Sequence, residues 1–301
     1  MKKVIILSTI VVVGAISGLT IANKKVEDKI SEAIVQSNSI NKDVTAKADV
    51  SANVLTGKLK FSNIDIQYYG NHLTEGEVIV DGIKFYDKEN MFSDVMKIEL
   101  NDFIVNQQDM KYISDNEIEI KNNPETGDLT LFTKSEFIDQ NDSSYKMVQS
   151  LDIKLSKTQN LYADLTKAFT LKVKDESADL QSIAPALLNK LSGSIVKSIN
   201  MGFSNDKMLQ RSIRKDLANK FPDVKEEDMD KFIAHQLGNE INKVPTIWQE
   251  PIKRVVLNPS STVNVDIIAK NDITLNYIYM ELLNGNPVQE TIMKNYEIII
   301  K

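Results

Sequence analysis

The chain has 301 residues, of which 42% are hydrophobic and 26% charged, a composition that allows one large globular domain or two smaller ones. The net charge is −6, with 15 lysines against 25 acidic residues between positions 43 and 181, and the more balanced region 204–255 carries no basic stripe that could bind a phosphate backbone. Nucleic acid is therefore excluded as a partner, and the absence of cysteine excludes disulfides, thiol nucleophiles and thiolate metal sites.

The N-terminus contains a long apolar run. Residues Val4–Ala22 carry no charge and lie between two pairs of lysines. A run of 19 residues is long enough to cross a bilayer as a helix, so we predict a transmembrane signal-anchor over residues 1–23, with the rest of the chain exported. The alternative is a cleaved signal peptide, because Thr20 and Ala22 are small residues near the position of a cleavage site. The run is longer than the roughly 7 to 15 residues of a usual signal core.

The next segment has a helical period. Val26, Ile30 and Ile34 are spaced to share one face, which predicts a helix over residues 24–42 that forms a stalk or a cap. From residue 43 the apolar period changes to two, and turn residues recur between the alternating stretches. This pattern predicts an antiparallel meander of long strands over residues 43–182.

Three of the alternating stretches contain the same irregularity. The sequences LKFSNIDI, VIVDGIKF and IELNDFIV each place two apolar residues three positions apart, where strict alternation would give two. One inserted residue is a β-bulge, which returns the apolar side chains to the same face and bends the strand. The inserted pairs are Ser-Asn, Asp-Gly and Asn-Asp, types that tolerate irregular backbone, so we predict a strongly curved sheet.

The period becomes helical again over residues 183–256. One predicted stripe contains Leu187, Leu191, Ile195 and Ile199, a second Leu209, Ile213 and Leu217, and a third Met229, Phe232, Ile233, Leu237 and Ile241. Residues 257–301 return to strand, form two short helices and end in a strand that completes the same domain. The predicted fold class is α+β, with a long curved antiparallel sheet carrying bulges, an amphipathic helical layer and a single N-terminal transmembrane helix.

The apolar N-terminal run, the repeated bulge pattern and the closing segment NPSSTVNVDIIAKNDITL together resemble the YdgA-like and AsmA-like envelope proteins of Gram-negative bacteria. The chain is shorter than expected for a YdgA-like member, and these motifs contain no catalytic signature. The resemblance implies a body in the periplasm anchored to the bacterial inner membrane, and a groove that handles lipid. The function of the YdgA-like family is itself unknown.

No motif predicts an enzyme, a metal site or a cofactor. His72 and His235 have no partner at metal-ligand spacing, and the acidic stretch EEDMDK is typical of a helix start rather than a calcium loop. Trp248 is interpreted as an amphipathic core residue, with a ligand or membrane-surface contact as the alternative. A hydrolase that uses a hidden carboxylate pair remains a minor alternative.

The candidate site is the apolar face of the first predicted strands. If curvature leaves this face open, it could hold a lipid or another apolar ligand; the alternative is that the helices after residue 182 fill it and form an ordinary core. A second alternative function is a structural scaffold for an envelope protein partner. The face comprises Leu59, Phe61, Ile64, Ile66, Val78, Val80, Ile83, Phe85, Ile98, Leu100, Phe103 and Val105.

Overall fold

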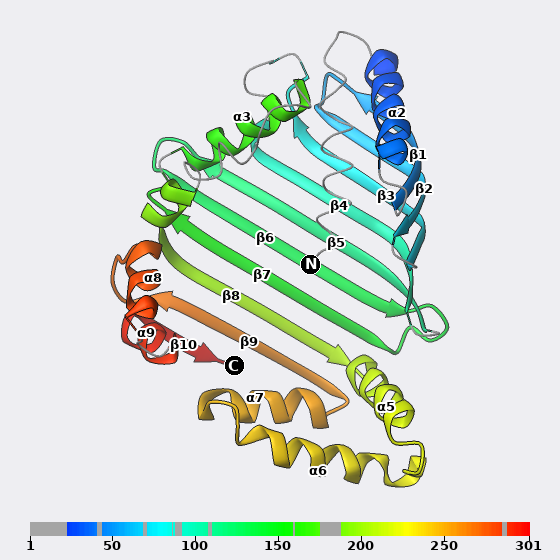
Figure 1. Cartoon of the computed structure of the whole chain (residues 1–301), viewed down its shortest axis with the longest axis vertical. Helices are drawn as coiled ribbons and strands as arrows, with labels where there is room; N and C mark the ends of the chain where they lie inside the picture. The colour runs from blue at the N-terminus through cyan, green and yellow to red at the C-terminus, as the bar shows by residue number, and fades with distance from the viewer. Residues whose placement is uncertain are drawn as a thin grey trace.

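The fold is built on one antiparallel sheet of ten strands whose spatial order equals their order in the sequence (Figure 1). The computed structural model describes residues 23–40, 44–68, 71–85, 87, 92–107, 110–158, 160–174, 188–284 and 288–301. The strands are β1 (Val44–Asn53), β2 (Lys58–Tyr68), β3 (Asn71–Ile83), β4 (Phe92–Gln107), β5 (Met110–Asn123), β6 (Asp128–Asp139), β7 (Lys146–Ser156), β8 (Ile195–Asp206), β9 (Ser260–Ala269) and β10 (Tyr296–Ile300).

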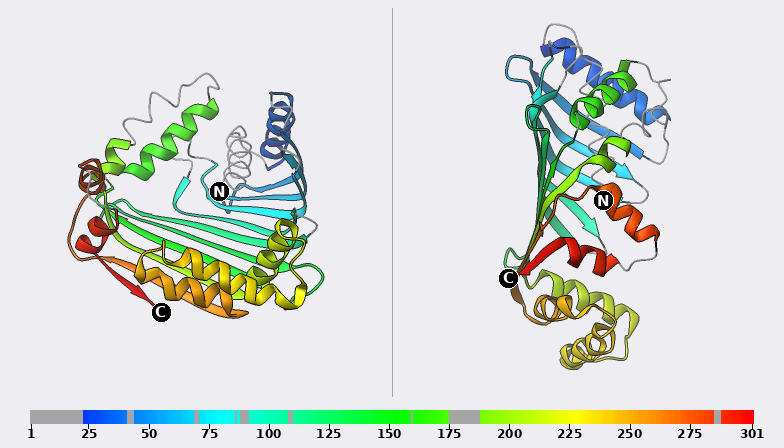
Figure 2. Two further views of the ribbon diagram at one scale, coloured as in Figure 1. Left: turned by 60° about the horizontal axis from the view of Figure 1, so that its bottom comes forward. Right: turned by 90° about the vertical axis from the view of Figure 1, so that its left-hand side faces the viewer.

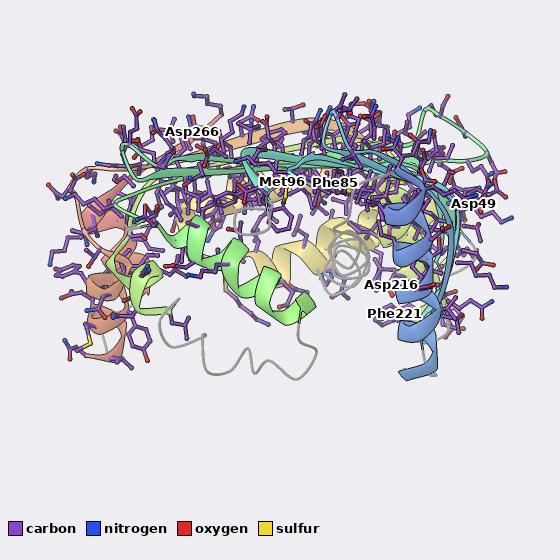
Figure 3. The ribbon with its side chains drawn as sticks, turned by 90° about the horizontal axis from the view of Figure 1, so that it is seen from above. Asp49, Phe85, Met96, Asp216, Phe221 and Asp266 are labelled. Carbon is purple, nitrogen blue, oxygen red and sulfur yellow. The ribbon has the colours of Figure 1, made fainter. Side chains whose placement is uncertain are left out.

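Helices cover one face of the sheet and extend past its β9 side (Figures 1 and 2). Figure 3 shows Phe85 and Met96 on the helix-bearing side and Asp266 on the opposite side. The predicted anchor over residues 1–23 lies almost entirely outside the described residues, and none of the described helices is long and apolar enough to span a bilayer. The helices are α2 (Asn23–Ile40), α3 (Leu161–Lys174), α5 (Met208–Lys220), α6 (Met229–Ile241), α7 (Thr246–Leu257), α8 (Leu275–Leu283) and α9 (Val288–Asn295).

The three predicted bulges are confirmed. The strand register shifts between Phe61 and Ile64 in β2, between Asp81 and Ile83 in β3, and between Leu100 and Phe103 in β4. Each shift contains a residue of positive φ, namely Asn63 at 51°, Gly82 at 98° and Asp102 at 58°. The left-handed conformation absorbs the extra residue, and the apolar side chains on both sides of it stay on one face. The first strands consequently turn out of the plane of β6–β9 (Figure 2).

The main core lies between the β1–β4 half of the sheet and α2. Val26, Ile30 and Ile34 of α2 are buried in one cluster with the apolar face of these strands, and Tyr162 of α3 joins the same cluster. A carboxylate and an amide fix the register of α2, because the backbone N–H of Ala52 donates to Glu27 and that of Val54 donates to Asn23. The predicted helix over residues 24–42 therefore exists and caps the sheet instead of forming a separate stalk.

Two predictions about the region after residue 156 are wrong. Residues 195–206, predicted as part of the helical region 183–256, form β8, which lies between β7 and β9 and pairs with both. Residues 161–174, predicted as part of the strand region, form α3. The expected helices around Leu209, Phe232 and Trp248 are present as α5, α6 and α7, and the C-terminal order of strand, two helices and strand is also confirmed.

Candidate functional site

The apolar face of the sheet is continuous from β3 to β10. Val80, Ile98 and Ile118 face one another in register across β3, β4 and β5. A parallel row crosses the second half of the sheet, where Leu131 pairs with Ile153, Ile153 with Ile199, Ile199 with Ile267 and Ile267 with Ile298. The two halves differ in burial, because the members of the first row on β3 and β4 are buried whereas those of the second row on β6–β9 are only half-buried.

The predicted ligand face belongs to the buried half. Eleven of its twelve residues are buried in the cluster that includes α2, and Val105 is half-buried. These side chains make up the main core of the part of the chain that the structure describes. The described helix that contributes most to this cluster is α2, which precedes the sheet in sequence. Helices α5, α6 and α7, which we expected to cover the face, lie past the β7–β9 side instead (Figure 1).

An apolar cavity of about 290 Å³ lies on the half-buried side, between β6, β7 and α3. We call it the apolar pocket. No polar side chain of the described residues lines it, and it lies at the start of β6 and the end of β7, two strands from β4, the last strand of the predicted face. Its lining residues are Leu129, Leu131, Ile153, Leu155, Leu161, Leu165, Leu188 and Leu191.

Polar contacts hold α3 over the apolar pocket. The backbone N–H and the hydroxyl of Thr158 both donate to the carbonyl of Gly127, each over 3.0 Å, which fixes the connection from β7 to α3. The hydroxyl of Tyr162 donates to the carbonyl of Ser93 over 2.7 Å, and burial raises the pKa of Tyr162 to about 12. Tyr162 therefore anchors the first turn of α3 to the start of β4, 69 residues earlier.

An ion pair closes the other side of the apolar pocket. Lys190, in the short helical segment 188–193, pairs with Asp164 of α3, which brings Leu188 and Leu191 over the cavity. Lys190 and Asp164 are not part of the cavity lining, in which the described residues are all leucine and isoleucine. Such a cavity offers no hydrogen-bond partner to water or to a charged group, so it suits hydrocarbon.

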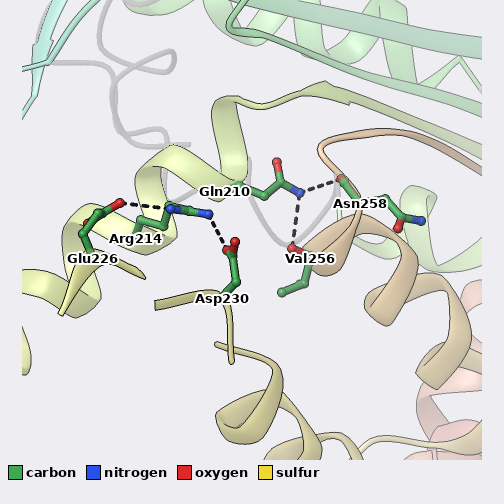
Figure 4. Close-up of polar contacts among 6 residues, drawn as sticks. All are labelled: Gln210, Arg214, Glu226, Asp230, Val256 and Asn258. Atoms are coloured by element: carbon green, nitrogen blue, oxygen red, sulfur yellow. Dashed lines mark hydrogen bonds and ion pairs between the residues drawn. The ribbon is translucent and has the colours of Figure 1, made fainter. Parts of the chain in front are cut away.

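A second cavity, of about 560 Å³, is polar and lies between α5, α6 and α7. Three of its charged side chains are paired with each other: Arg214 contacts Glu226 over 2.9 Å and also pairs with Asp230 (Figure 4), whereas Arg211 pairs with Asp139. Gln210 donates to the carbonyls of Val256 and Asn258 at the C-terminal end of α7, over 3.3 and 2.7 Å. These groups cap and fasten helices, and this use accounts for the residues EEDMDK at the start of α6.

The chain matches no known family model, and no curated protein shows significant similarity to it. The resemblance to YdgA-like and AsmA-like proteins therefore stays a prediction. The site must be interpreted from its own geometry.

Carboxylates that alternate with the core residues lie on the face of the sheet opposite the helices, and several of them form ion pairs. Lys97 contacts Glu99 over 2.6 Å and Glu117 over 3.0 Å, and the pKa of Lys97 is raised, mainly by its hydrogen bond to Glu99. Among the described residues no group of three or more histidine, aspartate or glutamate side chains could hold a metal ion. His235 is exposed and lies 3.5 Å from the amide nitrogen of Asn239.

The sequence analysis did not find the apolar pocket. Leu161 and Leu165 are four residues apart, a spacing that indicates a helix, but the strand pattern on both sides led us to extend the sheet through them. The pocket residues on the sheet alternate as expected for strands; they are Leu129, Leu131, Ile153 and Leu155. This alternation does not predict which strands would keep part of their apolar face uncovered by a helix. Trp248 of α7 is partly buried and far from the pocket residues in the sequence.

Proposed function

We propose that this protein binds the hydrocarbon chain of a lipid in the apolar pocket and acts without enzymatic chemistry. The observation that carries the proposal is the lining of that cavity, which consists of eight leucine and isoleucine side chains and no polar one. The volume of about 290 Å³ is at the lower end of the range of roughly 300 to 1,000 Å³ that is typical of small-molecule sites. One acyl chain suits this size better than a whole phospholipid.

The half-buried row of apolar side chains supports the same proposal. Leu131, Ile153 and Ile199 continue from the pocket across the sheet, so a chain longer than the cavity would stay on apolar surface. Covering such surface contributes about 25 cal/mol per Å² of apolar area removed from water. A ligand with a polar head would place that head at the rim, near Lys190 and Asp164, where charged groups already meet solvent.

The proposed location is the bacterial inner membrane, with a single N-terminal span over Val4–Ala22 and the folded domain in the periplasm. The uncharged 19-residue run and the resemblance to YdgA-like and AsmA-like proteins support this location. A scaffold that contacts an envelope protein is the alternative function. It would need no ligand in the apolar pocket, so binding measurements separate the two.

The test is native mass spectrometry of the full chain with palmitic acid, before and after a substitution that fills the cavity. Leu165→Trp adds volume inside the apolar pocket, whereas the control Leu257→Trp adds it at an exposed position near the polar cavity. We expect one bound palmitate in the wild type and in the control, and its loss from Leu165→Trp. Absence of any lipid adduct from the wild type, or equal binding by both variants, would overturn the proposal.

A further inference from the structure

One end of the sheet carries most of the exposed apolar side chains. This end, where β1, β3, β5, β7 and β9 finish, bears the turn 54–57, α3, α8 and α9, and we call it the α8 end. Of the twelve large hydrophobic residues found exposed in the described part of the chain, nine lie here. They are Leu55, Val95, Leu188, Ile268, Tyr277, Tyr279, Met280, Leu283 and Met293.

Helix α8 shows this exposure most clearly. Tyr279 and Leu283 are four residues apart and 59% and 61% exposed, and Met280, at 47%, lies beside them on the same face. An amphipathic helix of a water-soluble domain normally turns such a face toward the core. The backbone N–H of Leu275 donates to the carbonyl of Ser194 over 2.9 Å, which fixes the start of α8 to the start of β8. The apolar face of α8 is therefore held outward by the sheet.

Among the residues whose exposure the structure describes, the opposite end of the sheet shows no such concentration. Its turn 140–145 is polar, and the helices α5, α6 and α7 attached there expose only Phe221 and Leu257 among their large hydrophobic side chains. The asymmetry indicates that the α8 end faces an apolar environment that the other end does not meet.

The N-terminal apolar run is followed in the sequence by a residue that lies at the same end. It finishes at Ala22, directly before Asn23, the first residue of α2. Asn23 accepts a hydrogen bond from the backbone N–H of Val54 over 3.1 Å, next to Leu55, which is 95% exposed. A chain leaving the membrane after Ala22 therefore delivers the domain with Leu55 close to the bilayer, and α3 and α8 lie along the same border (Figure 1).

We propose that the α8 end is a membrane-docking surface and that its partner is the surface of a lipid bilayer. Tyrosine, methionine and leucine at the exposed face of α8 suit the boundary between headgroups and acyl chains, where tyrosine is enriched. The nearby exit of an apolar run long enough to span favours lipid over a protein partner. Docking in this orientation places the apolar pocket at the bilayer, because Leu188 belongs to both. The proposal goes beyond ligand binding and does not depend on it.

The experiment measures the depth of single tryptophans in the full chain, reconstituted into vesicles of phosphatidylethanolamine, phosphatidylglycerol and a brominated phosphatidylcholine. The native Trp248, in the first turn of α7, reports on the helices beside β9. Tyr279→Trp in a Trp248→Phe background reports on α8, and Phe221→Trp in the same background is a matched control of similar exposure. Circular dichroism verifies that each variant keeps its fold, and Tyr277→Trp serves as a second probe of the same helix.

We expect bromination to lower the emission of the tryptophan at position 279 by roughly twofold and to leave those at positions 221 and 248 nearly unchanged. Equal quenching at positions 279 and 221 would overturn the proposal. So would strong disulfide cross-linking between Tyr279→Cys copies, which would identify a second copy of the chain as the occupant. A pocket-filling change made as Leu165→Phe, which adds no second tryptophan, should leave the quenching pattern unaltered, and this separates failure of the ligand site from failure of docking.

Discussion

Arg211 and Asp139 are 72 residues apart in sequence and form an ion pair in which Nη1 lies 2.6 Å from Oδ2. The carboxylate of Asp139 is 1% exposed, and its other oxygen accepts the backbone N–H groups of Asn141 and Asp142. The guanidinium of Arg211 also lies over the ring of Tyr145, 4.7 Å from its centroid. One buried carboxylate thus ties the turn between β6 and β7 to α5.

Asp139→Asn is expected to lower the free energy of unfolding by about 1.5 to 3 kcal/mol, because hydrogen bonds to a charged group are stronger than neutral ones and Arg211 would lose its counter-charge. The control is Asp142→Asn in the same turn, at an exposed carboxylate, which should change the free energy of unfolding much less. Urea unfolding of both variants measures the difference. Equal midpoints would show that the buried pair contributes little.

Gly82→Ala is expected to destabilise the protein, whereas Gly238→Ala should stabilise it. At Gly82 φ is 98°, and an added Cβ would lie 2.4 Å from the carbonyl oxygen of Val95. At Gly238, inside α6, an added Cβ meets nothing within 4 Å, and alanine is favoured over glycine in a helix by about 0.8 to 1 kcal/mol. Thermal unfolding compares the two variants, and a shift of the same sign in both would contradict the bulge geometry at Gly82.

Glu75→Gly is expected to raise the free energy of unfolding by roughly 0.5 to 1 kcal/mol. Glu75 is exposed and has φ of 61°, a conformation that costs a residue with a Cβ but not glycine. The comparison is Glu77→Gly, two residues along β3. Glu77 has no positive φ, and its replacement by glycine removes an ion pair with Lys60. This second variant should be less stable than the wild type. Denaturant titration decides whether the two substitutions move stability in opposite directions.

Tyr162→Phe is expected to cost about 1 kcal/mol at neutral pH, through the lost hydrogen bond to the carbonyl of Ser93. The pKa of Tyr162 is raised from 10.0 to about 12, so its neutral form is favoured in the folded state. The contribution of Tyr162 to the free energy of unfolding is fully present below pH 10 and is lost as the pH rises through 12. The stability difference between wild type and variant, measured by denaturant unfolding at several pH values, should shrink over that interval; a constant difference would contradict the assignment.

The bulges could be predicted from sequence because each changes the parity of an alternating pattern. A strand must keep its apolar residues on one side, so the three-residue step from Val80 to Ile83 has a physical cause that the sequence alone identifies. The positive φ of Asn63, Gly82 and Asp102 adds the conformational detail. The residue types indicated where each bulge lies, and the structure gives the φ angle of the residue in it.

Strand β8 was predicted as helix because its apolar spacing fits both the helical period and the strand period. Leu191, Ile195 and Ile199 are four residues apart, which fits a helix of 3.6 residues per turn, but four is also a multiple of the strand period of two. The alternation of Ile199, Met201 and Phe203 favours the strand, and pairing with β7 and β9 decides it. The apolar pocket could not be predicted because it depends on where α3 lies, and Tyr162 reaches its acceptor across 69 residues.

The strictly sequential strand order has a consequence for how the protein is made. Each strand from β2 to β10 pairs with its predecessor in the chain, so a polypeptide delivered from its N-terminus can add one strand at a time to an existing edge. The edge advances with synthesis from β2 to β10, a strand of only five residues. Assembly is thus vectorial, and a truncated product would halt with a full-length, unpaired strand as its last edge.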